Sequence, residues 1–130
     1  LFMVDPCRWY GWRDFSGRPS LGTIREWYMT SWLYTGDVSN LELGKKISQT
    51  LGFDMEKFRN KPASAAEICD EARQLYYQPG FTAQNNLSES FGVDYFIFEH
   101  KFASNISEEL KKFSVFNNEH FSVVSSKDLP

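Results

Sequence analysis

The chain has 130 residues, a net charge of −3 and an aromatic share of 17%. This length fits one domain that buries roughly two thirds of its unfolded surface, so neither a disulfide nor a metal ion is needed for folding. The acidic balance argues against nucleic acid as a partner, because such binding depends on Lys and Arg at phosphates. No run approaches the roughly 20 apolar residues of a transmembrane helix, so we expect a soluble protein.

Residues 1–22 are predicted to form an irregular aromatic arm, because Pro and Gly interrupt every periodic pattern in them. Such an arm is too aromatic for a disordered tail, so we expect it to lie against another surface. Arginine beside Trp and Tyr is the composition of a protein-interaction hot spot. The predicted interaction residues are Arg8, Trp9, Tyr10, Trp12, Arg13 and Phe15.

Helical periodicity dominates the next segments of the chain. One helix is predicted to begin near Ser20 or Thr23 and to end near Tyr34. A second helix is predicted over 39–51, because residues 39–42 form a capping box and a glycine follows position 51. Its expected inward positions recur every four residues: Leu43, Ile47 and Leu51.

Three further helical segments follow. A short turn is predicted over 55–58, and a second capping box at 64–67 predicts a helix that ends before Pro79. Residues 82–91 are predicted to form another helix, with Gly92 at its end. The expected inward residues of the capped helix are Ile68, Ala72, Leu75 and Tyr76.

The periodicity changes at residue 93. Residues 93–100 are rich in strand-forming side chains and predict a strand that is buried on both faces near its middle. A short helix is predicted over 105–113. A hairpin is predicted over 114–124, with Asn117-Asn118 as its two-residue turn because Asn tolerates a positive φ.

Helices followed by strands predict an α+β fold, helix-rich in its N-terminal two thirds, with a small C-terminal antiparallel sheet. The expected organisation is an aromatic arm over 1–22, a single α+β domain over 23–124 and a polar tail over 125–130.

Both histidines of the chain follow a glutamate, in Glu99-His100 and Glu119-His120. If the two predicted strands are antiparallel neighbours, the histidines approach each other and, with one carboxylate, provide ligands for a metal ion. In that arrangement a general base is also available. Their spacing matches no known ligand motif, so we predict no metal, no cofactor and no catalytic residue.

The two cysteines, Cys7 and Cys69, share no motif spacing. We expect two free thiols, one of them buried. The alternative is a disulfide between them, which requires an oxidising compartment.

The leading functional hypothesis is a non-enzymatic protein-interaction or assembly subunit of a larger complex. The sequence begins Leu1-Phe2, as a processed chain would, which slightly favours an organelle and a photosynthetic or respiratory complex. One alternative is a bacterial immunity or inhibitor protein, whose acidic surface suits a basic toxin. The other is a small metal-binding protein or enzyme that uses the Glu-His pairs.

Overall fold

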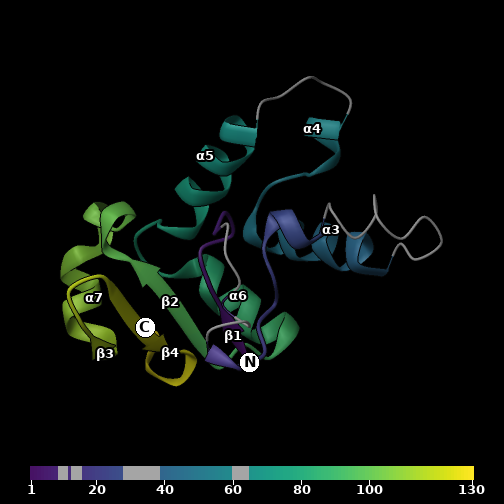
Figure 1. The fold of residues 1–130 in the computed structure, drawn as a ribbon. Coiled ribbons are helices and arrows are strands. Elements are labelled where there is room, and N and C mark those ends of the chain that lie inside the picture. The colour runs from purple at the N-terminus through teal and green to yellow at the C-terminus, as the bar shows by residue number, and fades with distance from the viewer. Residues whose placement is uncertain (9–11, 13–15, 28–38, 60–64) are drawn as a thin grey trace.

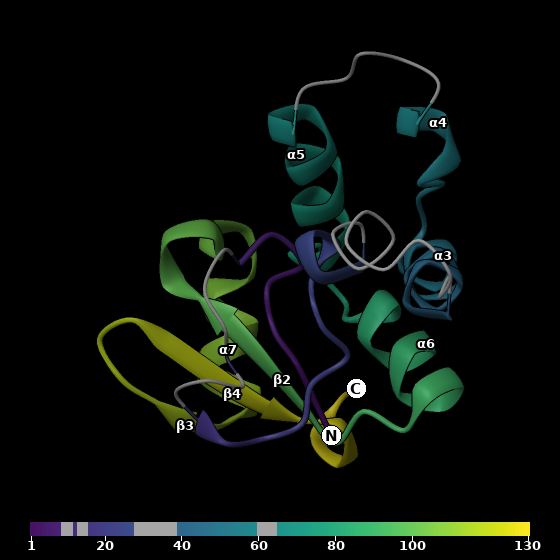
Figure 2. The ribbon, with the colours of Figure 1, turned by 45° about the vertical axis from the view of Figure 1, so that its right-hand side comes forward.

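In a computed structural model of this chain, the structure describes residues 1–8, 12, 16–27, 39–59 and 65–130. These residues form an α+β fold with a mixed four-stranded sheet, so the predicted fold class is confirmed (Figure 1). Figure 2 shows three helices, α3, α5 and α6, gathered on one side of the strands. None of the helices within the described residues combines the length and the hydropathy needed to cross a membrane.

The sheet has the strand order β1-β2-β4-β3. Its strands are β1 (Phe2–Met3), β2 (Tyr95–Glu99), β3 (Ser114–Asn117) and β4 (Phe121–Ser125). The three C-terminal strands pair antiparallel, as predicted, whereas β1 pairs parallel to β2. The predicted antiparallel sheet therefore gains an unpredicted strand from the opposite end of the chain.

Successive side chains of a strand point to opposite faces, and the register therefore assigns each residue to one face of the sheet. Phe98 lies against the helices, because its ring contacts Tyr76 of α5 and Phe81 at centroid distances of 5.1 and 5.7 Å. Its strand neighbours point the other way, onto what we call the outer face. From the pairing register, the outer face carries Ile97, Glu99, Phe116, Phe121 and Val123.

Helix α3 (Ser39–Leu51) has the predicted bounds. Its buried residues are Leu41, Gly44, Ile47, Ser48 and Leu51. Leu43, predicted to face inward, is 37% exposed instead. The contact with Trp27 rotates the buried face toward Gly44, and Trp27 packs there with 2% exposure.

The later helices match their predicted positions within a few residues. They are α4 (Glu56–Arg59), α5 (Ala65–Tyr76), α6 (Thr82–Phe91) and α7 (Ser107–Phe113). Three short 3₁₀ turns occupy His100–Phe102, Ser104–Ile106 and Ser126–Asp128. Of the helix predicted to begin near Ser20 or Thr23, residues 24–27 are helical, and its remainder lies outside the described residues. The second capping-box serine, at position 64, also lies outside them.

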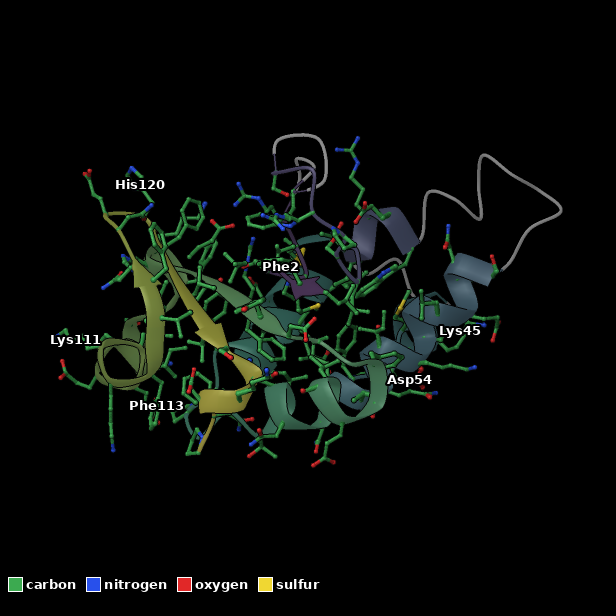
Figure 3. All side chains as sticks on the ribbon, turned by 90° about the horizontal axis from the view of Figure 1, so that it is seen from below. Phe2, Lys45, Asp54, Lys111, Phe113 and His120 are labelled. Carbon is green, nitrogen blue, oxygen red and sulfur yellow. A yellow bond between two sulfur atoms is a disulfide. The ribbon has the colours of Figure 1, made fainter. Side chains whose placement is uncertain are left out.

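Charged contacts connect α3 to α4. The Lys45 ammonium lies 3.1 Å from Glu42 on its own helix and 2.9 Å from Glu56 at the start of α4 (Figure 3). These hydrogen bonds raise the pKa of Lys45 above its usual value. The pairs are exposed, so their contribution to stability is small.

The N-terminal segment is not an arm separate from the core. Met3, Val4, Asp5 and Cys7 are each at most 5% exposed, and β1 extends the sheet.

The C-terminal residues 125–130 are not a free polar tail either. Ser125 ends β4, the Ser126 backbone N–H donates to the Asp94 carbonyl at 2.8 Å, and Leu129 packs against the core. Breakers in the first segment and polarity in the last one predict irregular chain, but the backbone groups of both ends find partners far away in the sequence.

The prediction of two free thiols is wrong, because Cys7 and Cys69 form a disulfide. Their Cα atoms lie 5.6 Å apart, at the separation that a disulfide requires. The bond joins the N-terminal segment to α5. No motif spacing reveals the pair, since its members have a sequence separation of 62 and only folding brings them together.

The hairpin turn lies two residues beyond its predicted position. Asn118 and Phe121 still pair, with the Asn118 backbone N–H donating to the Phe121 carbonyl at 2.9 Å, so Glu119 and His120 form the turn. The Asn118 side chain accepts hydrogen bonds at 2.8 Å from the backbone N–H groups of both His120 and Phe121. Asn118 therefore contributes a side-chain acceptor rather than the expected positive φ.

Candidate binding pocket on the outer face of the sheet

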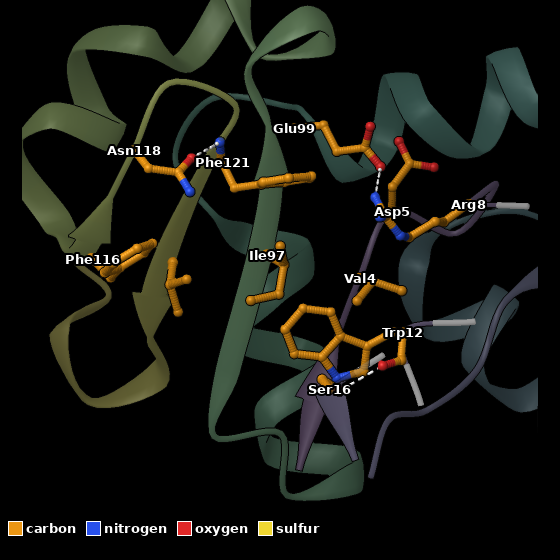
Figure 4. Close-up of a pocket in the computed structure, with 11 residues that line it drawn as sticks. Val4, Asp5, Arg8, Trp12, Ser16, Ile97, Glu99, Phe116, Asn118 and Phe121 are labelled. Carbon is orange, nitrogen blue, oxygen red and sulfur yellow. Dashed lines mark hydrogen bonds and ion pairs between the residues drawn. The ribbon is translucent and has the colours of Figure 1, made fainter. Parts of the chain in front are cut away.

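A pocket of about 340 Å³ lies between the outer face of the sheet and the N-terminal segment (Figure 4). Strands β2, β3 and β4 provide its floor, and residues of the N-terminal segment that follow β1 provide its opposite wall. The lining residues are Val4, Asp5, Arg8, Trp12, Ser16, Ile97, Glu99, Phe116, Asn118, Phe121 and Val123.

Most of this lining is apolar. The floor follows from strand alternation, because Ile97 pairs with Val123 and Glu99 pairs with Phe121 on the same face. Trp12 of the N-terminal segment also lines the pocket, and its ring contacts Phe2 at a centroid distance of 5.3 Å. An aromatic and aliphatic lining with a few polar groups is typical of ligand-binding pockets.

One margin of the pocket is the edge of the sheet. Strand β3 is the last strand in the order, and the structure describes no strand on its outer side. Its Val115 and Phe116 are each 55% exposed, the largest exposures among the described large apolar residues. The Phe116 ring lines the pocket, so the exposed edge and the pocket form one continuous surface.

The opposite end of the pocket is charged. The Arg8 guanidinium donates from Nη1 to Glu99 Oε1 at 2.7 Å. Lys101 Nζ lies 3.1 Å from the second oxygen of the same carboxylate. The Glu99 side chain is only 10% exposed, so these two cations compensate a carboxylate largely withdrawn from water.

Asp5 is the most deeply buried acid at this end, with a side chain 0% exposed. Its carboxylate accepts hydrogen bonds from the Cys7 backbone N–H at 2.7 Å, from Arg73 Nε at 2.9 Å and from the Tyr77 hydroxyl at 3.0 Å. Burial raises the pKa of Tyr77 far above its usual value, and the Asp5 charge raises it further. The Tyr77 hydroxyl therefore stays protonated and keeps donating to Asp5.

Two nitrogen donors in the pocket wall lack a partner. Arg8 Nε and the indole Nε1 of Trp12 are both inaccessible to water, and neither makes a hydrogen bond to a described residue. The Arg8 guanidinium also lies over the Phe121 ring, 5.3 Å from its centroid. The described part of this wall therefore holds two buried side-chain donors that no described acceptor satisfies.

The pocket includes some of the residues that the sequence predicts to contact a partner. Arg8 and Trp12, two of the six predicted interaction residues, line it. The other four, Trp9, Tyr10, Arg13 and Phe15, lie outside the described residues. The prediction missed the residues contributed by the sheet: Ile97, Glu99, Phe116, Phe121 and Val123. The alternation of side chains within 95–99 and 121–124 shows which residues of one strand share a face. It shows which residues of two strands share a face only once the strand register is known.

The two histidines do approach each other, because β2 and β4 are antiparallel neighbours and the His100 backbone N–H donates to the His120 carbonyl at 2.9 Å. Both lie just outside the strands, however. The His100 ring contacts the Glu119 carbonyl through Nδ1 at 3.1 Å and the Ser122 hydroxyl through Nε2 at 2.8 Å. Ser122 belongs to β4 and is only 1% exposed, so this hydrogen bond connects the end of β2 to the hairpin.

The glutamates of these two pairs separate. Glu99 points to Arg8, whereas Glu119 is exposed in the turn at the tip of the hairpin, where Figure 3 shows its neighbour His120. Within the described residues, no three His, Cys, Asp or Glu side chains gather closely enough to hold a metal ion.

The fold and the pocket together define an α+β protein with an amphipathic pocket on the outer face of a mixed sheet. Comparison with known proteins adds no family to this description: no family model, no curated protein and no solved structure matches the chain.

Proposed function

We propose that this chain is a non-enzymatic protein-interaction domain that binds an extended segment of a partner protein. The segment lies along β3 and places one apolar side chain in the pocket. The observation that carries this proposal is the continuity between the pocket and the sheet edge, where Val115 and Phe116 are each 55% exposed.

The edge of the sheet supplies the backbone part of this interaction. Among the described strands, β3 pairs with β4 alone, and its second row of backbone groups is available to an added strand. Adding a strand at a sheet edge is a recurring way of recognising an extended peptide. The irregularity between Ser114 and Phe116 limits the regular edge to the C-terminal part of β3.

The pocket supplies the side-chain part. Its volume of about 340 Å³ is at the lower end of the range for ligand pockets and suits a single large side chain with some surrounding space. Aromatic walls and an arginine are the composition of interaction hot spots. A partner side chain held there gains apolar contact and fixes the register of the added segment.

The disulfide bears on where such a partner is found. Disulfides persist in oxidising compartments, and Cys7–Cys69 therefore favours such a compartment over a reducing cytosol. We propose an assembly subunit as the biological setting, in which the partner is a component of a larger complex. A photosynthetic or respiratory organelle complex is one candidate for that complex.

Selection of displayed peptides on the immobilised protein tests the binding mode. We expect extended peptides with large apolar residues to be enriched, and Phe116→Ser to weaken them at least tenfold. Leu43→Ser is the matched control, because Leu43 is an exposed apolar residue on α3, outside the pocket lining. Peptides that bind both variants as tightly as the wild type, or no enrichment at all, would overturn the proposal.

A further inference from the structure

We infer that the pocket recognises a carboxylate attached to an apolar body, and that this carboxylate is the C-terminus of the partner segment. The inference rests on the proposed function, since it specifies which part of the partner enters the pocket. The carboxylate lies at Arg8, and the last side chain of the partner lies among Trp12, Ile97 and Phe121.

Hydrogen-bond accounting at Arg8 indicates an acceptor. A guanidinium carries five N–H donors and no acceptor. The only hydrogen bond of the Arg8 side chain to another described residue joins Nη1 to Glu99. Its Nε is buried without a partner among the described residues, and the side chain, which lines the pocket, is 30% exposed as a whole.

The acids at this end are already engaged. Asp5 accepts three hydrogen bonds, and the two oxygens of Glu99 lie beside Arg8 and Lys101. Together with Arg73, three cations pair with two carboxylates among the described residues, an excess of one positive charge, although Lys101 is 67% exposed. A ligand with a single negative charge completes this balance, whereas a cationic ligand adds to the excess.

The shape of the pocket separates the charged part of the ligand from its apolar part. Figure 4 shows Arg8, Asp5 and Glu99 together at one end and Ile97 and Trp12 below them. A carboxylate at Arg8 is recognised by charge-assisted hydrogen bonds, which are stronger than neutral ones. The apolar group next to it then lies on the outer face of the sheet, and the preceding residues continue toward β3.

Paired peptides test the carboxylate directly. Pools of hexapeptides that end in Leu, Ile or Phe are synthesised with a free C-terminus and, separately, with a C-terminal amide. We expect the free acids to bind at least tenfold more tightly to the wild-type protein, measured by fluorescence anisotropy. In Arg8→Gln this preference disappears, while Arg18→Gln, which changes an exposed arginine outside the pocket lining, retains it.

Arg8→Gln is first checked by circular dichroism and urea unfolding, and Arg8→Lys provides a variant that keeps the charge. We expect Arg8→Lys to retain part of the preference for the acid, because a charge remains but the planar donor array is lost.

Other outcomes separate this inference from the proposed function. If acid and amide bind equally and Phe116→Ser still weakens both, the inference of carboxylate recognition is overturned, and the proposed interaction domain stands. If 3-phenylpropanoate binds with the same dependence on Arg8 and no peptide binds, the carboxylate is not the C-terminus of a partner protein. The pocket then binds free organic acids. Absence of any Phe116-dependent peptide binding overturns the proposed function itself.

Discussion

Asp5 and Arg73 are 68 residues apart in the sequence, yet Arg73 Nε donates to Asp5 Oδ2 at 2.9 Å. The same carboxylate oxygen accepts from the Tyr77 hydroxyl, and both partners belong to the end of α5 and the residue after it. This contact holds the segment that carries Val4 and Arg8 against the core. The pocket therefore depends on a connection between the N-terminal segment and α5.

Asp5→Asn is expected to lower the free energy of unfolding by about 3 kcal/mol, because breaking a buried pair leaves Arg73 without its counter-charge. Urea unfolding followed by circular dichroism measures this change. Glu108→Gln is the control, since its carboxylate is 83% exposed and its pair with Lys111 contributes less than about 1 kcal/mol. Equal losses for the two variants would contradict the role assigned to Asp5.

Removing the disulfide is expected to cost about 4 kcal/mol, because the bond closes a loop with a sequence separation of 62 and restricts the unfolded chain. Urea unfolding with and without reductant measures the effect. The Cys69→Ser variant serves as the control, because its stability is expected to be the same with and without reductant. A wild-type midpoint that does not shift on complete reduction would show that the bond contributes nothing to stability.

Gly44→Ala is expected to destabilise the protein by about 1–3 kcal/mol, although alanine favours a helix over glycine by about 1 kcal/mol. A Cβ at this position would lie 2.5 Å from Trp27 Cβ and 2.6 Å from its Cγ, so the tryptophan and α3 must move apart. Thermal and urea unfolding measure the change, with the exposed Gln49→Ala in the same helix as the control. Stabilisation by Gly44→Ala would mean that α3 and Trp27 do not pack this closely.

The stability advantage of wild type over Tyr77→Phe is expected to shrink above pH 10. Burial raises the pKa of Tyr77 in the folded state, so its stabilising contribution is complete below the unfolded pKa of about 10 and is lost as the pH rises above it. The advantage should fall by about 1 kcal/mol between pH 10 and pH 11. Urea unfolding of both proteins across this range tests it, and a constant difference would contradict it.

Local sequence signals were sufficient for most helices and for the two strands of the hairpin, but not for the position of its turn. The bounds of α3 and α6 follow from periodicity with glycine at the ends, because these signals act within a few residues of the chain. The error at Leu43 has a tertiary cause. Four-residue spacing describes a helix face, but the close approach of Trp27 to Gly44 decides which face is buried.

The sequence by itself determined the α+β class and the order of the helices and of strands β2, β3 and β4 along the chain. Only the tertiary structure decided that the first residues extend the sheet, that Cys7 pairs with Cys69, and that Glu99 faces Arg8. The physical reason is the same in each case. These contacts join positions far apart in the chain, and a local pattern specifies how a segment folds but not which distant segment it meets.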